Sequence, residues 1–236
     1  MSTRLEVAGL GRRPYAETLE LQRELCRRRM AGELSHDVLL LVEHEPVVTL
    51  GRGTRPSSLP LPPEELARRG VGVYEVERGG DVTYHGPGQL VGYPILDLRE
   101  HREDLHWYLR QLEASLIRGL GTLGIHGDRN PGLTGVWTRR RKIASIGIHV
   151  KRWVTFHGFA LNVTTELAAF GLIVPCGIDG VVMTSVAREL GRTDAAALEA
   201  ETRAAVVDGV ATTFGYVGVD ETSGLTGVSA AAWGSV

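Results

Sequence analysis

TGVWTRRRKIASIGIHVKRWVTFHGFALNVT, residues 134–164, is the most informative stretch of the chain for the fold class. Apolar, strand-length pieces alternate in it with two charged runs, at residues 139–142 and 151–152. Such a pattern is typical of consecutive antiparallel strands joined by tight turns. We therefore expect a β-meander of two or three strands here.

The flanking sequence contains further strand candidates interspersed with helices. Residues 36–51, 71–77 and 89–98 are short apolar or alternating runs, and we expect strands in them. Helical spacing, prolines at first turns and an Asp cap predict helices at 14–31, 61–70, 104–120, from about 165 and at 194–213, with a capped turn at 184–191. Because strands and helices do not alternate strictly, the fold class expected is α+β with a mixed or antiparallel sheet.

The composition is that of an ordinary globular protein. The chain has 236 residues, of which 43% are apolar and 23% charged, and no shift in composition demands a second domain. We expect one domain over residues 1–215 and a flexible C-terminal tail over 216–236. A formal charge of −2 gives no overall attraction to nucleic acid or to an anionic membrane. The N-terminal residues contain no apolar run of signal-peptide length, and no run approaches the roughly 18 apolar residues of a membrane span, so we expect neither feature.

Two cysteines, Cys26 and Cys176, are too few for a disulfide framework or for a zinc site made of cysteines. They could pair with each other, but so few cysteines favour a reducing compartment, so we expect a cytoplasmic protein. Cys26 falls on the apolar side of the first helix, which predicts packing. Cys176 instead stands in FGLIVPCGIDG, residues 170–180, a glycine-rich turn after a proline. This context fits either an idle loop residue or a reactive thiol.

A reactive cysteine needs a nearby cation or base. The thiolate is the nucleophile, and an unperturbed thiol with a pKa of about 8.5 is only a few per cent ionised at neutral pH. His157, His85, His149 and Lys142 are candidates for this partner. Their spacing in the sequence does not choose among them, since such partners meet in space. Lys142 also fits an outward-pointing member of the basic run.

RGGDVTYHGPGQLVGYP, residues 78–94, is the densest cluster of glycines and polar side chains. Its glycines allow close approach of the backbone to a ligand, and Thr83, Tyr84 and His85 can donate hydrogen bonds there. The same composition fits a glycine-rich hairpin with a hydrogen-bonded histidine. Neither GxxxxGK[ST] nor GxGxxG occurs in it, so the segment is not evidence for a nucleotide site.

Four motifs in order, RGGDVTYHGPGQLVGYP, RKIASIGIHV, FHGFALNV and IVPCGI, resemble the octanoyltransferases of protein lipoylation. The resemblance covers roughly residues 15–215, and MTSVARELG also resembles the segment that follows the cysteine in this family. The family belongs with the catalytic domains of biotin and lipoate protein ligases. The resemblance therefore implies a single α/β domain with a central mixed β-sheet flanked by helices.

The resemblance also implies roles for individual residues. Cys176 matches the nucleophile that carries the octanoyl group as a thioester, and Lys142 matches the lysine that favours its thiolate. His157 is expected to help shape the site. The positions that match substrate-binding residues are Arg78, Gly79, Gly80, Asp81, Val82, Thr83, Tyr84 and His85, then Ser145, Ile146 and Gly147, and then Gly158, Phe159 and Ala160.

The implied reaction moves an octanoyl group from acyl carrier protein to a lysine of a lipoyl domain, in 2-oxoacid dehydrogenase complexes or the glycine cleavage H protein. No ATP or metal is expected, because the acyl group arrives as a thioester on the phosphopantetheine of the carrier. The basic residues 139–142 and 151–152 form a candidate docking patch for these acidic partners, or simply a solvated hairpin.

Three other functions stay open. An ATP-dependent ligase would not need Cys176, a thioesterase would use Cys176 with His157 or His85, and an acyl-binding module would need no catalysis.

Overall fold

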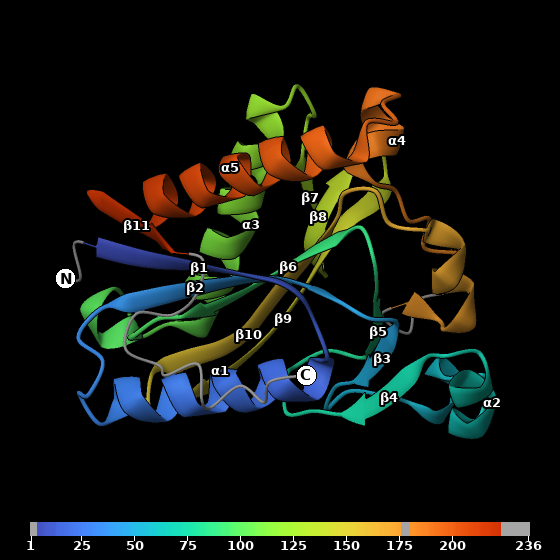
Figure 1. The fold of residues 1–236 in the computed structure, drawn as a ribbon, viewed down its shortest axis with the longest axis horizontal. Helices are drawn as coiled ribbons and strands as arrows, with labels where there is room; N and C mark the ends of the chain where they lie inside the picture. The colour runs from blue at the N-terminus through green and yellow to red at the C-terminus, as the bar shows by residue number, and fades with distance from the viewer. Residues whose placement is uncertain (1–3, 176–179, 223–236) are drawn as a thin grey trace.

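A mixed β-sheet runs through the centre of the molecule (Figure 1). The computed structural model describes residues 4–175 and 180–222, and within these the sheet has eight strands in the order β11-β1-β2-β6-β10-β9-β8-β7. β1 pairs parallel with β2 and β11, and the other neighbouring pairs are antiparallel. The strands are β1 (Arg4–Arg13), β2 (Asp37–His44), β6 (Gln89–Ile95), β7 (Asp128–Asn130), β8 (Leu133–Thr138), β9 (Arg141–Lys151), β10 (Val154–Asn162) and β11 (Gly218–Thr222).

The meander expected for residues 134–164 is confirmed, because β8, β9 and β10 are consecutive antiparallel neighbours. Two-residue turns join them, Arg139–Arg140 and Arg152–Trp153, and the φ angles of these residues are +46°, +64°, +48° and +66°. Positive φ at both central residues defines the type I′ turn, whose twist matches that of the paired strands. The four turn residues, all with large side chains, therefore have a backbone conformation that such residues rarely adopt.

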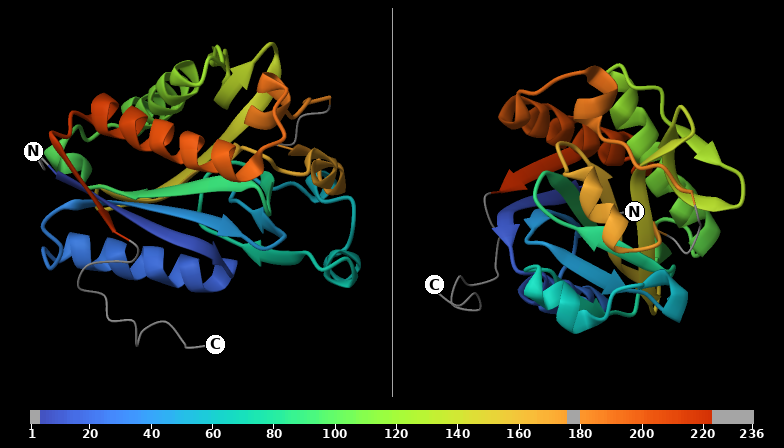
Figure 2. Two further views of the ribbon diagram at one scale, coloured as in Figure 1. Left: turned by 45° about the horizontal axis from the view of Figure 1, so that its top comes forward. Right: turned by 90° about the vertical axis from the view of Figure 1, so that its right-hand side faces the viewer.

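Helices cover both faces of the sheet (Figures 1 and 2). α3 (Leu105–Thr122) and α5 (Ala195–Phe214) pack on the face that carries Leu39 and Leu41, and α1 (Tyr15–Met30) packs on the face that carries Val38 and Leu40. β2 is thus buried on both sides, which explains its continuous apolar run. None of the helices in the described ranges combines the length and hydropathy needed to cross a bilayer.

The helices predicted at 14–31, 104–120 and 194–213 are confirmed as α1, α3 and α5. The Asp104 side chain caps α3 by accepting a hydrogen bond from the Trp107 N–H at 3.0 Å. In α3, Tyr108 and Leu112 are fully buried, whereas Leu105 in the first turn is 45% exposed. Cys26 is buried in the core under α1, as its helical spacing predicted.

A second, smaller sheet lies against one end of the main sheet (Figure 1). Within the described ranges it has three strands in the order β4-β3-β5, with β5 antiparallel to β3. The segment expected to be helical from about residue 165 is a 3-10 helix, η3. The remaining elements are β3 (Val47–Leu50), β4 (Gly72–Glu75), β5 (Val82–His85), α2 (Pro63–Arg68), α4 (Val186–Leu190), η1 (Pro56–Ser58), η2 (Leu98–Glu100) and η3 (Leu167–Leu172).

The C-terminal boundary expected at residue 215 is wrong. Tyr216 is buried, and β11 adds a parallel strand to β1, with Gly218 opposite Arg4 and Thr222 opposite Ala8. The expected tail therefore contributes a strand to the sheet. Its remaining residues, 223–236, lie outside the described residues.

A buried ionic cluster centred on Asp37 lies at the start of β2. The fully buried Asp37 carboxylate accepts hydrogen bonds from Arg29 at 3.1 Å, His101 Nε2 at 2.8 Å and the Tyr216 hydroxyl at 2.8 Å. It also accepts the Asp97 backbone N–H at 3.0 Å. A buried carboxylate is tolerated when it is paired in this way, and here it joins the end of α1 to the chain that follows α5.

Candidate active site

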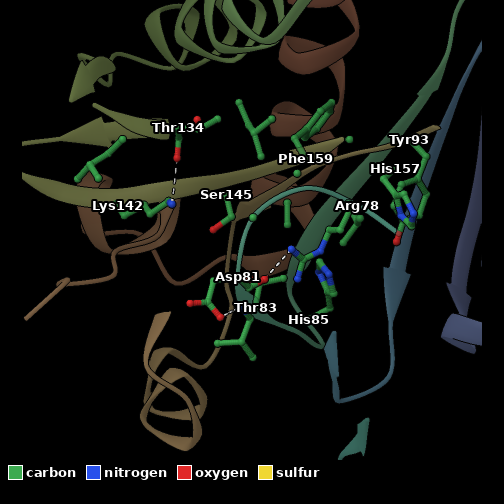
Figure 3. A pocket seen from close by; sticks show the side chains of 18 of the residues that line it. Arg78, Asp81, Thr83, His85, Tyr93, Thr134, Lys142, Ser145, His157 and Phe159 are labelled. Atoms are coloured by element: carbon green, nitrogen blue, oxygen red, sulfur yellow. Dashed lines mark hydrogen bonds between the residues drawn. The ribbon is translucent and has the colours of Figure 1, made fainter. Parts of the chain in front are cut away.

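A cavity of about 220 Å³ lies where the second sheet meets the main sheet (Figure 3). Its walls come from β5, from β6, β9 and β10, and from the residues around the start of β8. Val82, Ile146 and Phe159 supply apolar surface, whereas Arg78 and Lys142 supply cations. Apolar walls with a few polar groups are typical of sites for small acyl or aromatic ligands.

The three segments expected to bind substrate meet at this cavity, and Lys142 and His157 line it with them. Gly79 and Tyr84 do not line it: the Gly79 N–H donates to Ile148 O at 2.8 Å, and the Tyr84 ring packs on Phe170 in the core of the second sheet. The expected residues that do line it are Arg78, Gly80, Asp81, Val82, Thr83, His85, Ser145, Ile146, Gly147, Gly158, Phe159 and Ala160.

Six further described residues line the cavity without having been predicted from the sequence. Tyr15 is on the packing side of its helix, and Tyr93 is in an apolar strand, so both looked like ordinary core residues. No local signal separates a core tyrosine from one whose ring borders a cavity. The six are Tyr15, Val91, Tyr93, Gly132, Leu133 and Thr134.

Lys142 is only 2% exposed, although the two arginines of the preceding turn point to solvent. Its Nζ donates a hydrogen bond to Thr134 O at 3.1 Å and lies 5.5 Å from the centroid of the Trp137 ring (Figure 3). The alternative that Lys142 points outward with the basic run is therefore wrong. A buried ammonium beside a cavity is placed to act on an anion within it.

Cys176, the expected nucleophile, lies outside the described residues, together with residues 177–179. The chain on its C-terminal side pairs with Lys142: the Lys142 N–H donates to Val182 O at 2.8 Å, and the Thr184 N–H donates to Lys142 O at 2.9 Å. On the N-terminal side the Val174 N–H donates to Ser58 O at 2.9 Å. The backbone thus runs directly beside Lys142 six residues after Cys176.

The buried Arg78 side chain stabilises the glycine-rich segment through hydrogen bonds to backbone carbonyl groups. Its guanidinium donates to Asp81 O at 2.7 Å (Figure 3). It also donates to Thr49 O at 2.7 Å. The Asp81 carboxylate accepts hydrogen bonds from Ser58 Oγ at 2.7 Å and from the Val82 N–H at 2.7 Å. These contacts hold the segment in one shape, so this wall of the cavity exists before any ligand arrives.

The histidines at and behind the cavity wall are neutral: His85 lines the cavity, whereas His44 contacts Tyr93, which lines it. His44 Nδ1 donates to Arg13 O at 3.0 Å, so its Nε2 accepts the Tyr93 hydroxyl at 2.7 Å, and burial lowers the pKa of His44 to about 4. His85 Nδ1 donates to Gln89 Oε1 at 2.8 Å, because the Gln89 amide hydrogens have other acceptors. Burial also lowers the pKa of His85 to about 3. The His85 ring is therefore neutral at pH 7, with Nε2 as an acceptor.

His157 combines backbone strain with a buried polar atom. It stands within β10 at φ +57°, and its N–H donates to Gln22 Oε1 at 2.9 Å. Its Nε2 has no hydrogen-bond partner and lies 3.7 Å from a carboxylate oxygen of Glu77. Burial lowers the pKa of His157 to about 3, so the ring is neutral and this contact is not an ion pair at pH 7. Strain of this kind is often found at functional sites, and a role of His157 in the reaction stays a prediction.

The single basic docking patch expected from the sequence does not exist. β9 has 11 residues, so the turn at 139–140 and the turn at 152–153 are separated by roughly 30 Å. Arg139 and Arg140 instead border a groove with Arg129 and the exposed Val182. Leu133 lines both this groove and the cavity, so the two are neighbours. In residues 4–175 and 180–222 no group of three or more His, Cys, Asp or Glu side chains is placed to hold a metal ion.

The sequence matches the lipoyl protein ligase A/B catalytic domain over residues 14–209. The chain is 56% identical over 164 residues to the octanoyltransferase of Synechococcus elongatus, covering 70% of this chain and 69% of the relative. It is 50% identical over 199 residues to the octanoyltransferase of Acidobacterium capsulatum, covering 79% of this chain and 80% of the relative. The chain therefore belongs to the lipoyl protein ligase A/B catalytic-domain family, among its octanoyltransferases.

Solved structures of this family share the fold. A putative lipoate protein ligase from Thermoplasma acidophilum with bound lipoic acid superimposes with a TM-score of 0.70 at 15% identity, covering 94% of this chain and 90% of the other. A lipoate-protein ligase A bound with ATP gives a TM-score of 0.70 at 16% identity, covering 96% and 90%. The predicted α/β fold with a central mixed sheet is confirmed. As an octanoyltransferase, the protein is an acyltransferase that moves an octanoyl group in protein lipoylation.

Proposed function

We propose that the chain transfers an octanoyl group from octanoyl-acyl carrier protein to the ε-amine of a specific lysine on a lipoyl domain, through a thioester on Cys176. The observation that carries the proposal is the buried Lys142 at the cavity wall, beside the chain that follows the Cys176 segment. An ammonium in this position favours the thiolate that a cysteine nucleophile requires.

The reaction has two acyl transfers. In the first, the Cys176 thiolate attacks the thioester carbonyl carbon, a new carbon–sulfur bond forms, and the phosphopantetheine sulfur leaves and takes up a proton. In the second, the neutral ε-amine of the acceptor attacks the acyl-cysteine, a carbon–nitrogen bond forms, and Cys176 leaves as a thiolate while the nitrogen loses a proton. Exchange of thioesters is nearly isoenergetic and amide formation is downhill, so the proposal includes no ATP and no metal.

Lys142 acts in both transfers of this proposal. Its ammonium stabilises the Cys176 thiolate before the first transfer. Once the sulfur is acylated, the ammonium no longer faces an anion and can lose its proton, and the neutral amine then accepts the proton of the attacking lysine. Arginine keeps the charge but cannot serve as a base, so Lys142→Arg should slow discharge of the preformed acyl-enzyme. Discharge at the wild-type rate would contradict the second role.

The acyl tail occupies the cavity in this proposal. Val82, Ile146 and Phe159 line it with apolar surface, and each buried methylene contributes about 0.8 kcal/mol to binding. The other residues of segments 78–85, 145–147 and 158–160 that line the cavity, Gly79 and Tyr84 excepted, surround this apolar surface. His157 shapes the cavity wall through its strained backbone.

The acyl donor is the carrier protein with its phosphopantetheine arm. The acceptors are lipoyl domains of 2-oxoacid dehydrogenase complexes and the glycine cleavage H protein. We place the reaction in the cytoplasm, where thiols stay reduced.

The test is the intact mass of the enzyme after mixing with octanoyl-acyl carrier protein in the absence of ATP. We expect an octanoyl adduct on the wild-type enzyme and none on Cys176→Ser, and discharge of the adduct when a lipoyl domain is added. Release of free octanoate without an acceptor would indicate a thioesterase. Product formed only from free octanoic acid and ATP, with no adduct, would indicate a ligase and would leave Cys176 without a catalytic role.

The carrier is proposed to approach over the turn at Arg139 and Arg140. This turn borders the groove beside the cavity, and Arg140 pairs with no carboxylate among the described residues. Charge complementarity with an acidic carrier raises the association rate at low salt.

Charge reversal tests this approach with a matched control. Arg139→Glu/Arg140→Glu should slow acylation about three- to tenfold at low salt, and less at high salt. Lys151→Glu/Arg152→Glu makes the same change of charge at the opposite end of β9 and should leave the rate unchanged. Equal slowing by both variants would mean that only net charge matters.

A further inference from the structure

The peptide group between Thr134 and Gly135 is held from both sides by charged side chains. Its carbonyl oxygen accepts the hydrogen bond of Lys142 Nζ at 3.1 Å (Figure 3). Its N–H, which belongs to Gly135, donates to Glu113 Oε1 at 3.2 Å. An ammonium and a carboxylate are thus joined through a single amide unit.

Glu113 is fixed firmly enough to hold this peptide. The residue is 1% exposed although it lies on α3 near the protein surface. Its Oε2 accepts hydrogen bonds from Arg110 Nη1 at 2.6 Å and from Arg129 Nε at 2.9 Å. Two guanidinium groups therefore offset the cost of burying the carboxylate, and they leave Oε1 directed at Gly135.

Because Gly135 has no side chain, it leaves room for the Lys142 side chain to cross the start of β8. Its φ is +132°, a conformation open to glycine, and a Cβ atom there would lie 2.8 Å from Lys142 Cε and 2.6 Å from Ala144 O. The pairing of β8 with β9 shifts register at the next residues, Val136 and Trp137. The irregular start of β8 thus places Thr134 O where it can accept the hydrogen bond of Lys142 Nζ.

We propose that Glu113 is a positioning residue for Lys142. By binding the Gly135 N–H, it fixes Thr134 O in place, and it makes that oxygen a stronger acceptor because hydrogen bonds in series polarise one another. The ammonium is then held at one point of the cavity wall. This inference rests on the proposed role of Lys142 beside Cys176.

A purely structural role for Glu113 is the competing explanation, since the carboxylate also joins α3 to β7 and β8. The two explanations differ in one respect. A positioning residue loses its effect on the thiol when Lys142 is absent, whereas a structural residue keeps it. A double-mutant cycle measures this difference.

The experiment follows alkylation of Cys176 by iodoacetamide at pH 7 in the full-length enzyme, with the adduct located by mass spectrometry. Cys26 should contribute little, because it is 2% exposed and burial raises the pKa of its thiol to about 11. Glu113→Asp keeps the charge but is one methylene shorter, so it cannot reach both the arginines and Gly135. We expect it to slow alkylation about three- to tenfold in the Lys142 enzyme and to have no further effect in Lys142→Ala.

Two more variants guard against a simple loss of folding. Glu113→Gln keeps the side-chain length and an oxygen for the Gly135 N–H, so its alkylation rate should lie between those of Glu113→Asp and the wild type. Asp37→Asn alters a buried carboxylate at the other end of the sheet. It should lower the urea midpoint of unfolding without changing the alkylation rate of the folded enzyme.

The outcomes separate the two proposals. Suppose that Lys142→Ala slows alkylation. If Glu113→Asp then slows alkylation equally with Lys142 and with Ala at position 142, or slows it in neither enzyme, Glu113 does not act through Lys142 and the inference is wrong. If Lys142→Ala itself leaves alkylation unchanged, the proposed pairing of Lys142 with Cys176 is wrong, and the role of Glu113 falls with it.

Discussion

The two ends of β2 carry two buried polar clusters of opposite character. At its start, Asp37 is surrounded by Arg29, His101 and Tyr216, and both carboxylate oxygens accept hydrogen bonds. At its end, roughly 20 Å away, His44 belongs to a group of histidine and tyrosine rings that burial keeps neutral.

The two clusters differ in how many of their polar atoms are left without a hydrogen bond. The carboxylate of the Asp37 cluster is occupied on both oxygens, so the cluster holds elements together and has little left to offer a ligand. Around the cavity, His157 Nε2 has no hydrogen-bond partner, and the neutral His85 ring keeps an acceptor nitrogen. Spare polar groups beside an enclosed apolar space are what a binding site needs. Of these two buried clusters, only the one beside the cavity therefore has polar atoms available to a ligand.

The largest effect is expected from breaking the fully paired cluster. Asp37→Ala would remove one of the two carboxylates that pair with the buried Arg29, leaving Glu100, and would take from His101 and Tyr216 the carboxylate that accepts their hydrogen bonds. Loss of one member of a buried ion pair typically costs about 3–5 kcal/mol. Urea unfolding should show this loss, whereas octanoyl transfer per folded molecule should not change. Asp220→Ala removes the exposed ion pair with Arg4 and should lower the stability far less. A similar cost for both variants would mean that the Asp37 cluster contributes no more than a surface pair.

A smaller effect is expected from filling space at the cavity. A Cβ on Gly92 would lie 2.1 Å from the ring of Phe159, its partner across β6 and β10. Gly92→Ala should therefore displace the ring, lower the free energy of unfolding by about 1–3 kcal/mol and slow acylation by the octanoyl donor. Gly121→Ala in α3, where a Cβ meets nothing within 4 Å, is the matched control and should stabilise the protein by up to about 1 kcal/mol. Wild-type acylation by Gly92→Ala would show that Phe159 does not define the acyl site.

The smallest of the three effects concerns pH. The pKa of His44 is lowered to about 4 in the folded protein, against roughly 6.5 when unfolded, so between these values only the unfolded state binds the proton. Stability is therefore lost as the pH falls below about 6.5, at about 1.4 kcal/mol per pH unit for this residue. His44→Gln should make the slope of unfolding free energy against pH shallower by that amount between pH 6 and 4.5. Equal slopes for His44→Gln and wild type would mean that folding does not lower the pKa of His44.

The local elements were predictable from the sequence, and the contacts between distant segments were not. The meander and the capped helix at Asp104 have strong local signals in residue spacing and capping. β1 was missed because its sequence, RLEVAGLGRR, contains two glycines and three arginines, and its strand character depends on pairing with β2 and with β11 from the other end of the chain.

The candidate site shows the same limit. Motif positions predicted most of the cavity wall, since consecutive strands bring them together. No local pattern in the sequence marks Glu113 as buried, because its burial depends on Arg129 from β7 and on the peptide of Gly135. The prediction of a single basic patch was wrong for the opposite reason. The basic residues at 139–140 and at 151–152 are near one another in sequence but lie at the two ends of the 11-residue strand β9.

β11 has a consequence for how copies of this protein behave toward one another. Without it, β1 would present the backbone N–H and C=O groups of Arg4–Ala8 as an open edge, and such an edge recruits strands from other molecules. β11 itself is short and carries Asp220 and Glu221, which are features that discourage further pairing. A chain shortened to residue 215 would lose this protection together with Tyr216. β11 therefore covers an edge that would otherwise be open to pairing between molecules, and its removal should increase self-association.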